Sequence, residues 1–271
     1  MAKEISKPSD SMELQSDLNN VLEWTKLWGM KFNSEKCVQM TVSNKKKQIS
    51  TQYFLGNEIL DKKNVIKYLG VSIDNKLTFK HHIQEKSKKA MTVLNMLRRN
   101  LHFAPRSVKA KAYMACAQPI LESASTCWAP TSKKLNNMLE MVHHNAAKFV
   151  TNIYPRKKEN HKFSITKILN DLDWDTLEER RNKARLNMAY KIINGHVILE
   201  PSMLPKINLQ RPRQCNEAKV GTINQLKEPQ PRLDVVKSTF FFSTPKLWNM
   251  NVTPSQAKAP SMEAFKGHFE K

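Results

Sequence analysis

Apolar residues recur at every third or fourth position through the middle of the chain, a spacing typical of amphipathic helices. The pattern predicts a helix from about His81 that carries Ile83, Leu94 and Leu101 on one face. Pro119 should kink the helix after it, because proline removes one backbone hydrogen bond. Further helices are expected over residues 107–128, 132–154, 164–171 and 176–193.

Several of these helices carry capping residues at their ends. Thr131 or Ser132 should open the third helix, since both side chains can accept a hydrogen bond from a free backbone N–H. Asp175–Glu178 has the pattern of a capping box at the start of the fifth helix, and Asn194–Gly195 should end it.

The first 78 residues begin as a helix and then change to the alternation typical of strands. Asp10–Glu13 has the pattern of a capping box that opens the helix, and Gly29 suits its C-terminal cap. Apolar and polar residues alternate over 38–42, which predicts a half-buried strand. Gly70 would mark a bulge or a close backbone approach within the last strand. Further strands are expected at 53–55 and 65–73.

The last part of the chain loses the helical spacing. Prolines interrupt residues 196–234, which predicts an extended segment, and 235–242 is strand-like. A short helix after Pro260 could carry Phe265 and Phe269. We therefore expect an α+β protein, mostly α, with a small antiparallel sheet, a helical bundle and a Pro-rich tail. The expected domains are 1–78, 79–195 and 196–271.

The charge balance points to a polyanionic partner. Lys and Arg total 45 against 24 Asp and Glu, which gives a net charge of +21 and a pI near 9.8. An excess of this size favours nucleic acid, although a solvated basic surface without a dedicated ligand is the alternative. Only six glycines are present, which favours helix over a glycine-punctuated β architecture.

The remaining composition indicates an intracellular protein, in the nucleus or the cytoplasm. The four cysteines have no zinc-site spacing and are expected to be reduced. No apolar run reaches the roughly 18 residues of a membrane span. The N-terminus has no apolar core, so no signal peptide and no membrane partner are expected.

Two blocks, Trp24–Cys37 and Lys67–Asp74, resemble the end of the palm domain of non-LTR retrotransposon reverse transcriptases of the LINE or jockey-like kind. The resemblance continues through the thumb and tail of that family. It rests on the order of the pieces rather than on any single one. The further matches are Lys109–Tyr113, Pro119–Ala124 with Trp128, Leu139–Glu140, Ala146–Val150, Leu172–Trp174, Leu177–Arg181, Phe240–Phe242 and Leu247–Asn249.

The resemblance implies a polymerase without its metal site. In this family a Tyr-x-Asp-Asp turn and an earlier aspartate hold two Mg²⁺ ions. Only 23 residues precede Trp24, and no two aspartates are adjacent, so we expect no metal and no cofactor in this chain. Lys36 matches the lysine that would protonate the departing pyrophosphate. The alternative is that Lys36 is an ordinary surface lysine.

Other residues gain candidate roles from the same resemblance. Tyr68, Leu69 and Gly70 could place a backbone turn against a primer strand, or could form a core strand that needs no ligand. Trp24 and Trp28 should pack against the sheet rather than stack on bases. The adjacent histidine pairs cannot share one metal ion, and we expect them at the surface or at helix ends. These pairs are His81–His82 and His143–His144.

The first two thumb-like helices carry a basic cluster that would lie along the sugar-phosphate backbone of a duplex. We expect it to bind RNA, or an RNA–DNA or DNA duplex, without sequence preference. A second basic cluster on the fifth helix, Arg180, Arg181, Lys183 and Arg185, has no assigned use. The members of the first cluster are Lys86, Lys88, Lys89, Arg98, Arg99, Arg106, Lys109 and Lys111.

The sequence therefore predicts a truncated reverse transcriptase-like protein, inactive alone, whose thumb still binds nucleic acid. Three alternatives stay open: a domesticated nucleic-acid-binding module, an unstable product of a truncated element, and an unrelated basic RNA-binding protein. The sequence does not decide between RNA and DNA, and it leaves the oligomeric state open.

Overall fold

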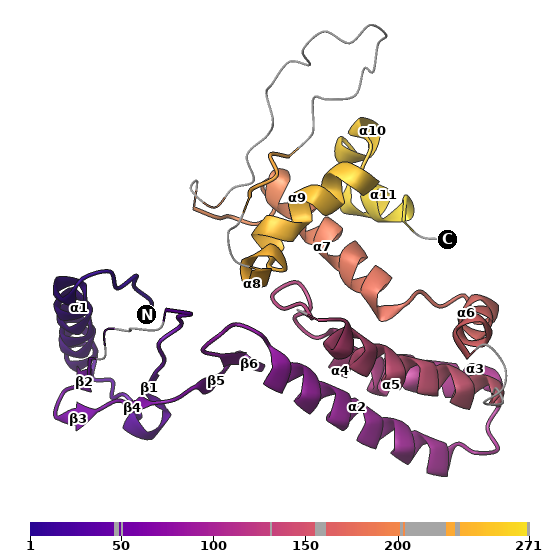
Figure 1. The fold of residues 1–271 in the computed structure, drawn as a ribbon, viewed down its shortest axis with the longest axis horizontal. Coiled ribbons are helices and arrows are strands. Elements are labelled where there is room, and N and C mark those ends of the chain that lie inside the picture. Colours follow the sequence, from indigo (N-terminus) through magenta and orange to yellow (C-terminus); the bar gives the residue numbers. More distant parts are fainter. Residues whose placement is uncertain are drawn as a thin grey trace, which may run out of the picture. The chain divides into compact units, whose positions relative to one another are not determined.

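The computed structural model divides the chain into two compact units, Met1–His81 and His82–Lys271 (Figure 1). The protein is mostly helical, with small two-stranded sheets, as the apolar spacing predicts. No helix in the described part of the chain is long and apolar enough to cross a bilayer. The described residues are 1–45, 49, 51–130, 132–154, 161–200, 203, 226–230 and 234–269.

Helix α1, Pro8–Leu27, begins three residues earlier than the sequence pattern suggests. Asp10 is not the N-cap residue: its carboxylate reaches back from the first turn and accepts the Lys7 N–H at 2.9 Å. Pro8 suits the first helical position because that N–H would have no helical partner. Gly29 follows the helix with φ +64°, so the predicted C-terminal cap is confirmed.

The strands of the first unit form three separate pairs rather than one antiparallel sheet. β1 and β4 pair in parallel, which differs from the expected antiparallel arrangement, while β2 and β3 form an antiparallel hairpin around Gly56. The alternation over 38–42 yields only a two-residue strand. The bounds are Val38–Gln39 for β1, Phe54–Leu55 for β2, Glu58–Ile59 for β3 and Asp61–Lys62 for β4.

The segment expected as a single strand over 65–73 is an antiparallel hairpin. Strand β5, Val65–Tyr68, turns back into β6, Val71–Asp74, and Tyr68 pairs with Val71. Leu69 and Gly70 form the turn, with φ of +45° and +81°. Positive φ at both central positions gives a twist that matches the flanking strands. Gly70 therefore marks a turn, and the predicted mid-strand bulge is wrong.

In the described residues, helices α2 to α7 form the first part of the second unit. The helix expected over 107–128 is two helices, because α3 ends at Cys116 and a new helix begins at Gln118, with Pro119, which lacks a backbone N–H, in its first turn. That second helix ends before Trp128. The bounds are Lys80–Asn100 for α2, Arg106–Cys116 for α3, Gln118–Glu122 for α4, Lys133–Thr151 for α5, His161–Asp171 for α6 and Leu177–Ile193 for α7.

Helix α5 packs against α3, α6 and α7 and supplies much of the core. Its predicted apolar stripe is buried along the whole helix: Leu135, Leu139, Val142, Ala146 and Phe149. The predicted cap is confirmed, since the Ser132 hydroxyl accepts a hydrogen bond from the Leu135 N–H. The helix ends at Thr151, three residues before the predicted end at residue 154, and Asn152 follows in the left-handed conformation.

Helix α7 is capped by Thr176 and Glu179, one residue later than the predicted box. The Thr176 hydroxyl accepts the Glu179 N–H at 3.2 Å, and the Glu179 carboxylate accepts the Thr176 N–H at 2.8 Å. Asn194 and Gly195 end the helix as predicted, with φ +72° at Gly195.

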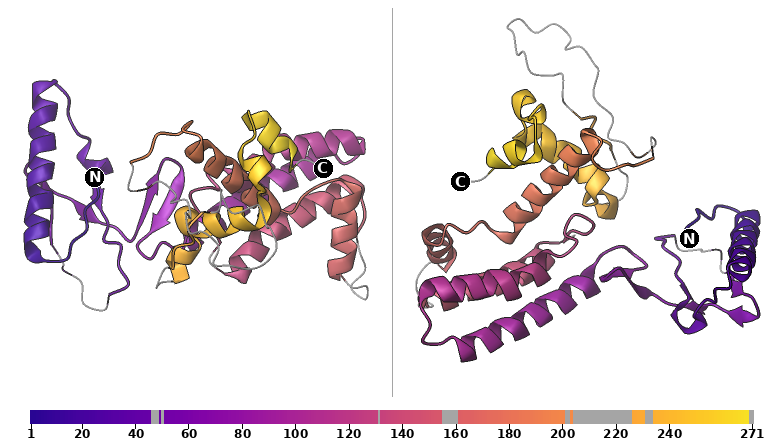
Figure 2. Two further views of the ribbon diagram at one scale, coloured as in Figure 1. Left: turned by 90° about the horizontal axis from the view of Figure 1, so that it is seen from above. Right: turned by 180° about the vertical axis from the view of Figure 1, so that it is seen from behind.

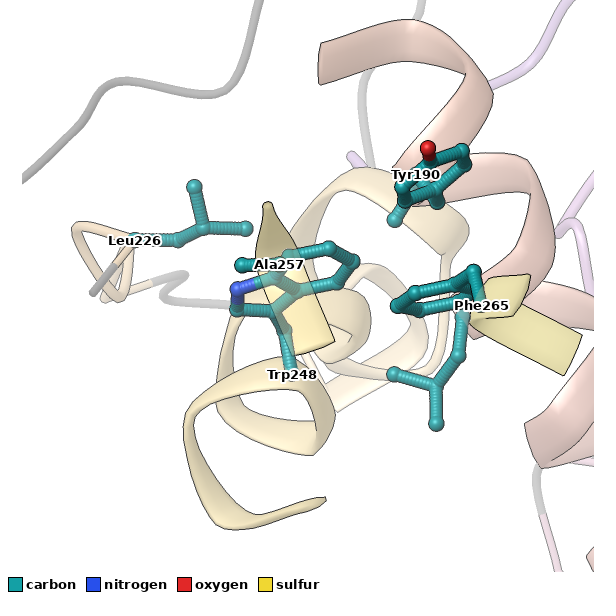
Figure 3. Close-up of a cluster of buried hydrophobic side chains, with 7 residues drawn as sticks. Tyr190, Leu226, Trp248, Ala257 and Phe265 are labelled. Carbon is teal, nitrogen blue, oxygen red and sulfur yellow. The ribbon is translucent and has the colours of Figure 1, made fainter. Parts of the chain in front are cut away.

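The C-terminal segment is helical and packs on α7, so the predicted strand over 235–242 is wrong. Helices α9 and α11 pack beside α7 (Figures 1 and 2). Tyr190 stacks on Phe265 at 4.4 Å between ring centroids, and Trp248 stacks on the same ring at 5.7 Å (Figure 3). The bounds are Asp234–Lys237 for α8, Phe240–Asn251 for α9, Pro254–Ala257 for α10 and Met262–Gly267 for α11.

Most of the predicted extended segment over 196–234 lies outside the described residues. The predicted helix after Pro260 is confirmed. It buries Phe265 completely, and Phe269 packs against the same cluster just beyond the helix.

Candidate nucleic-acid interface

Three of the candidate basic residues lie on the outer face of α2. Lys88, Lys89 and Arg99 are exposed, and none of them has an acidic partner among the ion pairs of the described residues. They lie opposite the apolar stripe of the helix, because residues three, four, seven and eleven apart share a face. That stripe is buried through Ile83, Ala90, Leu94 and Leu97.

Two other basic residues of α2 turn toward the bundle. Arg98 is half-buried, and its Nη2 donates to the backbone carbonyl of Asn145 on α5 at 2.8 Å. Lys86 is also half-buried, and its Nζ donates to the Ser123 hydroxyl at 3.0 Å. Arg98 was expected to lie along a phosphate backbone with the rest of the cluster and therefore to face solvent, but its guanidinium instead holds α2 against α5.

Helix α3 divides its basic residues in the same way. Lys111 is exposed, whereas Lys109 is buried, with 2 % of its surface accessible. The Lys109 Nζ donates to the side-chain oxygen of Asn152 at 3.1 Å and lies 5.2 Å from the centre of the Phe149 ring. The Lys109 ammonium at this position interacts favourably with the backbone carbonyl groups at the C-terminal end of α5. Lys109 is therefore a structural residue rather than a phosphate contact.

Arg106 begins α3 and is exposed but paired. Its Nη2 donates to the Asp171 carboxylate at 2.7 Å and to the Asp171 backbone carbonyl at 2.8 Å, which ties α3 to the end of α6. An exposed pair of this kind contributes little to stability. Its guanidinium is partly neutralised, so Arg106 is a weaker candidate than its unpaired neighbours.

We give the name α2–α3 basic face to the exposed, unpaired residues Lys88, Lys89 and Arg99 of α2 and Lys111 of α3. The surrounding sequence contains no compensating acid: residues 86–121 include eight Lys or Arg and no Asp or Glu. The second unit as a whole holds 32 of the 45 basic residues and 15 of the 24 acidic ones. The positive charge of the protein is therefore concentrated in the second unit.

The second basic cluster, on α7, has structural partners. Arg180 forms an ion pair with Glu122, and burial lowers the pKa of Arg181, which donates to the side-chain oxygen of Asn136. Arg185 is buried and donates to the Ser238 carbonyl at 3.0 Å. Lys183 pairs with Asp175 in the loop before the helix. These contacts hold α7 to its neighbours, so this cluster is not a candidate interface.

The hairpin turn of the first unit projects two large side chains into solvent. Tyr68 is 64 % exposed and Leu69 is 86 % exposed, with Gly70 beside them. A core strand would bury these residues, so the structural alternative for this segment is wrong. The turn is free to present its backbone to a ligand.

Lys36 ends a short 3₁₀ helix, Ser34–Lys36, and is exposed. Its backbone N–H donates to the Asn33 carbonyl at 3.1 Å. Among the residues that the structure describes, no group of three or more His, Cys, Asp or Glu side chains could hold a metal ion. These residues therefore do not fit the two-magnesium site of a polymerase.

The tryptophans of α1 are more exposed than their spacing suggests. Trp24 is 51 % exposed and Trp28 is 69 % exposed, with 6.1 Å between their ring centroids. The prediction that both pack against the sheet is wrong, because the strand pairs of this unit cover only part of α1. Residues Leu27, Met30 and Phe32 beside them are also exposed.

The prediction that the histidines lie at the surface or at helix ends is wrong for His143. His82 lies in the first turn of α2, a helix end, but is fully buried, with its ring 5.1 Å from that of Trp128. His143 is 1 % exposed, and burial lowers its pKa to about 4. Its ring lies 5.3 Å from that of Trp174, so it belongs to the core between α5 and the loop before α7.

Comparison with known proteins gives two matches from Drosophila melanogaster. The probable RNA-directed DNA polymerase from transposon BS is 26 % identical over 212 residues, which cover 76 % of this chain and 22 % of that protein. This chain is a relative of the non-LTR retrotransposon reverse transcriptases. The RNA-directed DNA polymerase from mobile element jockey is 33 % identical over 70 residues, 26 % of this chain and 8 % of that protein.

The reverse transcriptase-like chain spans less than a quarter of the length of these two relatives. No family model matches its sequence, and no solved structure matches it. The resemblance expected from the two blocks around Trp24 and Tyr68 is confirmed.

Proposed function

We propose that this chain is the duplex-holding part of a non-LTR reverse transcriptase-like protein and binds nucleic acid without sequence preference. The single observation that carries the proposal is the α2–α3 basic face, where four exposed cations lie in a stretch of sequence without acids. Phosphates are the common feature of RNA and DNA that such a face can bind.

The spacing along α2 suits one strand of a duplex. Lys88 and Arg99 are eleven residues apart, which corresponds to about 16 Å along the helix axis. A nucleic-acid strand places one phosphate roughly every 3.4 Å of duplex axis, so α2 could follow about five of them. Contacts of this kind fix the position of a duplex but do not read its bases.

The hairpin turn of the first unit supports the same assignment. By resemblance to the primer-gripping motif, its tip would contact the end of a nucleic-acid strand through the exposed Tyr68 and the backbone of Leu69 and Gly70. A left-handed glycine allows close backbone approach, since it has no side chain to intervene.

The chain is proposed to lack polymerase activity of its own. Phosphoryl transfer requires carboxylates that hold the metal ions on the attacking and leaving oxygens. The sequence contains no Tyr-x-Asp-Asp, and the described residues hold no carboxylate cluster. Without such a site no pyrophosphate departs, so Lys36 has nothing to protonate and behaves as a surface lysine.

Fluorescence anisotropy with a labelled RNA–DNA duplex tests the proposal. A variant with alanine at all four positions of the α2–α3 basic face should bind much more weakly than the parent chain. A matched control removes the same charge from other exposed sites of the second unit, Lys133, Lys134, Lys191 and Lys258.

The control should bind nearly as well as the parent, since long-range charge is screened over about 10 Å at ordinary salt. Equal binding by the parent and the basic-face variant would contradict the proposal. Equal loss of affinity in both variants would mean that binding depends on the net charge of the protein and not on the α2–α3 basic face.

A further inference from the structure

The loop between α2 and α3 carries an almost fully exposed aromatic ring. Phe103 is 97 % exposed, more than any other large apolar residue in the described part of the chain. A single exposed apolar side chain is common and means little alone. The structure of the loop and the charges near it in the sequence distinguish Phe103 from such side chains.

The backbone on both sides of Phe103 is fixed by hydrogen bonds. The Leu101 N–H donates to the Leu97 carbonyl at 2.8 Å, and the Ala104 N–H donates to the Leu101 carbonyl at 3.1 Å. Pro105 then caps the first turn of α3, where its carbonyl accepts the N–H of the residues that follow. Phe103 therefore stands at the tip of a hydrogen-bonded turn between two helices.

Among the described residues the ring has an aromatic neighbour, His102, and is otherwise almost uncovered. The rings of His102 and Phe103 meet edge to face, with 4.7 Å between centroids and 82° between planes. The contact favours one orientation of the Phe103 side chain and still leaves it 97 % exposed. A flat partner could therefore stack on the ring without displacing other side chains.

The turn joins the two helices of the basic face. Arg99 is exposed four residues before Phe103 along the chain, and Lys111 is exposed on α3 after it. The same acid-free stretch, residues 86–121, contains the turn. An apolar ring with basic neighbours on both sides fits a ligand that combines a flat aromatic surface with negative charge.

We propose that Phe103 stacks on an unpaired base of the nucleic acid whose phosphates lie on the α2–α3 basic face. This inference rests on the proposed function and names its ligand more closely, as a duplex with a single-stranded end. Every base has a flat face, so stacking of this kind needs no particular sequence. A fully paired duplex offers such a face only at its ends.

The test compares two RNA–DNA duplexes with the same number of phosphates, one blunt and one with an unpaired overhang. Phe103→Ala should weaken binding to the overhang duplex by about five- to a hundredfold and have a much smaller effect on the blunt duplex, whose base faces are free only at its two ends. Phe103→Trp should retain overhang binding. Phe103→Leu should behave like Phe103→Ala, because it keeps an apolar side chain and removes the aromatic face.

Ile198→Ala is the matched control, since Ile198 is 95 % exposed in the same unit. It should bind both duplexes as the parent does. A 2-aminopurine base in the overhang should lose fluorescence on binding the parent and not on binding Phe103→Ala, because stacking quenches it.

Two results would overturn the inference. Phe103→Ala could bind the overhang duplex as tightly as the parent, or Phe103→Leu could restore full binding. In either case salt-dependent binding by the parent would leave the proposed function standing. If the parent bound neither duplex, the proposed function and this inference would fail together.

Discussion

Acidification should destabilise the second unit through His143. The His143 Nε2 lies 3.1 Å from the Asp175 carbonyl oxygen, which can only accept, so Nε2 carries the proton of the neutral ring. Nδ1 then accepts from the Tyr113 hydroxyl at 2.7 Å. Burial lowers the His143 pKa to about 4, with smaller contributions from His144 and Arg180 in the same direction. The Asp175 carbonyl and Glu122 act in the opposite direction.

The sign and size of this pH effect follow from the pKa of His143 in the folded chain and in the unfolded chain. The unfolded chain has an ordinary histidine pKa of about 6.5, so between pH 6.5 and 4 it binds a proton that the folded chain excludes. The free energy of unfolding therefore falls as the pH falls through this window. The loss should be about 2 kcal/mol between pH 7 and pH 5.

Urea unfolding followed by far-UV circular dichroism at pH 7 and pH 5 measures this loss. His143→Gln should lose about 2 kcal/mol less than the parent over that interval, although it is less stable at pH 7. His144→Gln, at a half-buried neighbouring position, should lose nearly as much as the parent, because the burial of His143 is the larger cause of its low pKa and is retained. Burial raises the pKa of Glu140, which acts in the opposite direction in all three proteins and cancels in the comparison. Equal losses in the parent and His143→Gln would refute the reasoning.

Three further outcomes are expected. Lys109→Ala should lower the free energy of unfolding of the second unit by about 1–3 kcal/mol in urea titrations, since Lys109 is buried and the change removes its hydrogen bond to Asn152 and its packing against Phe149. Gly70→Ala should destabilise the hairpin by about 1 kcal/mol, seen as faster amide exchange in β5 and β6, because φ is +81° there. With primer, template, dNTPs and Mg²⁺, the purified chain should extend no primer above a no-protein control. Extension that Lys36→Ala abolished would contradict the proposed inactivity.

The helices could be predicted from the sequence because each carries a long apolar stripe. Along α5 the stripe from Leu135 to Phe149 is regular, and the structure buries all of it. The hairpin was missed because Leu69, an apolar residue, stands at a turn position that usually holds Asn, Asp or Gly. The run Phe240–Phe242 has high strand propensity, but the helix that begins there packs on α7 and decides the outcome.

The division of the basic residues into exposed and buried ones depends on tertiary packing. Lys109 did leave a signal in the sequence, because it lies four residues before the buried Tyr113 and therefore on the buried face of α3. Arg98 left a weaker signal, because it lies at the edge of the apolar stripe of α2. Phe103 was missed because it lies between two helices, where periodicity has no meaning. Its exposure could be found only in the folded chain.

The salt dependence of duplex binding tests the central claim most directly. For the parent, log affinity against log salt should fall with a slope of about 0.9 for each phosphate bound. Alanine at Lys88, Lys89, Arg99 and Lys111 should reduce the slope by up to about 3.6, while the control variant of equal charge keeps the slope of the parent. A basic-face variant with the affinity and slope of the parent would contradict the account.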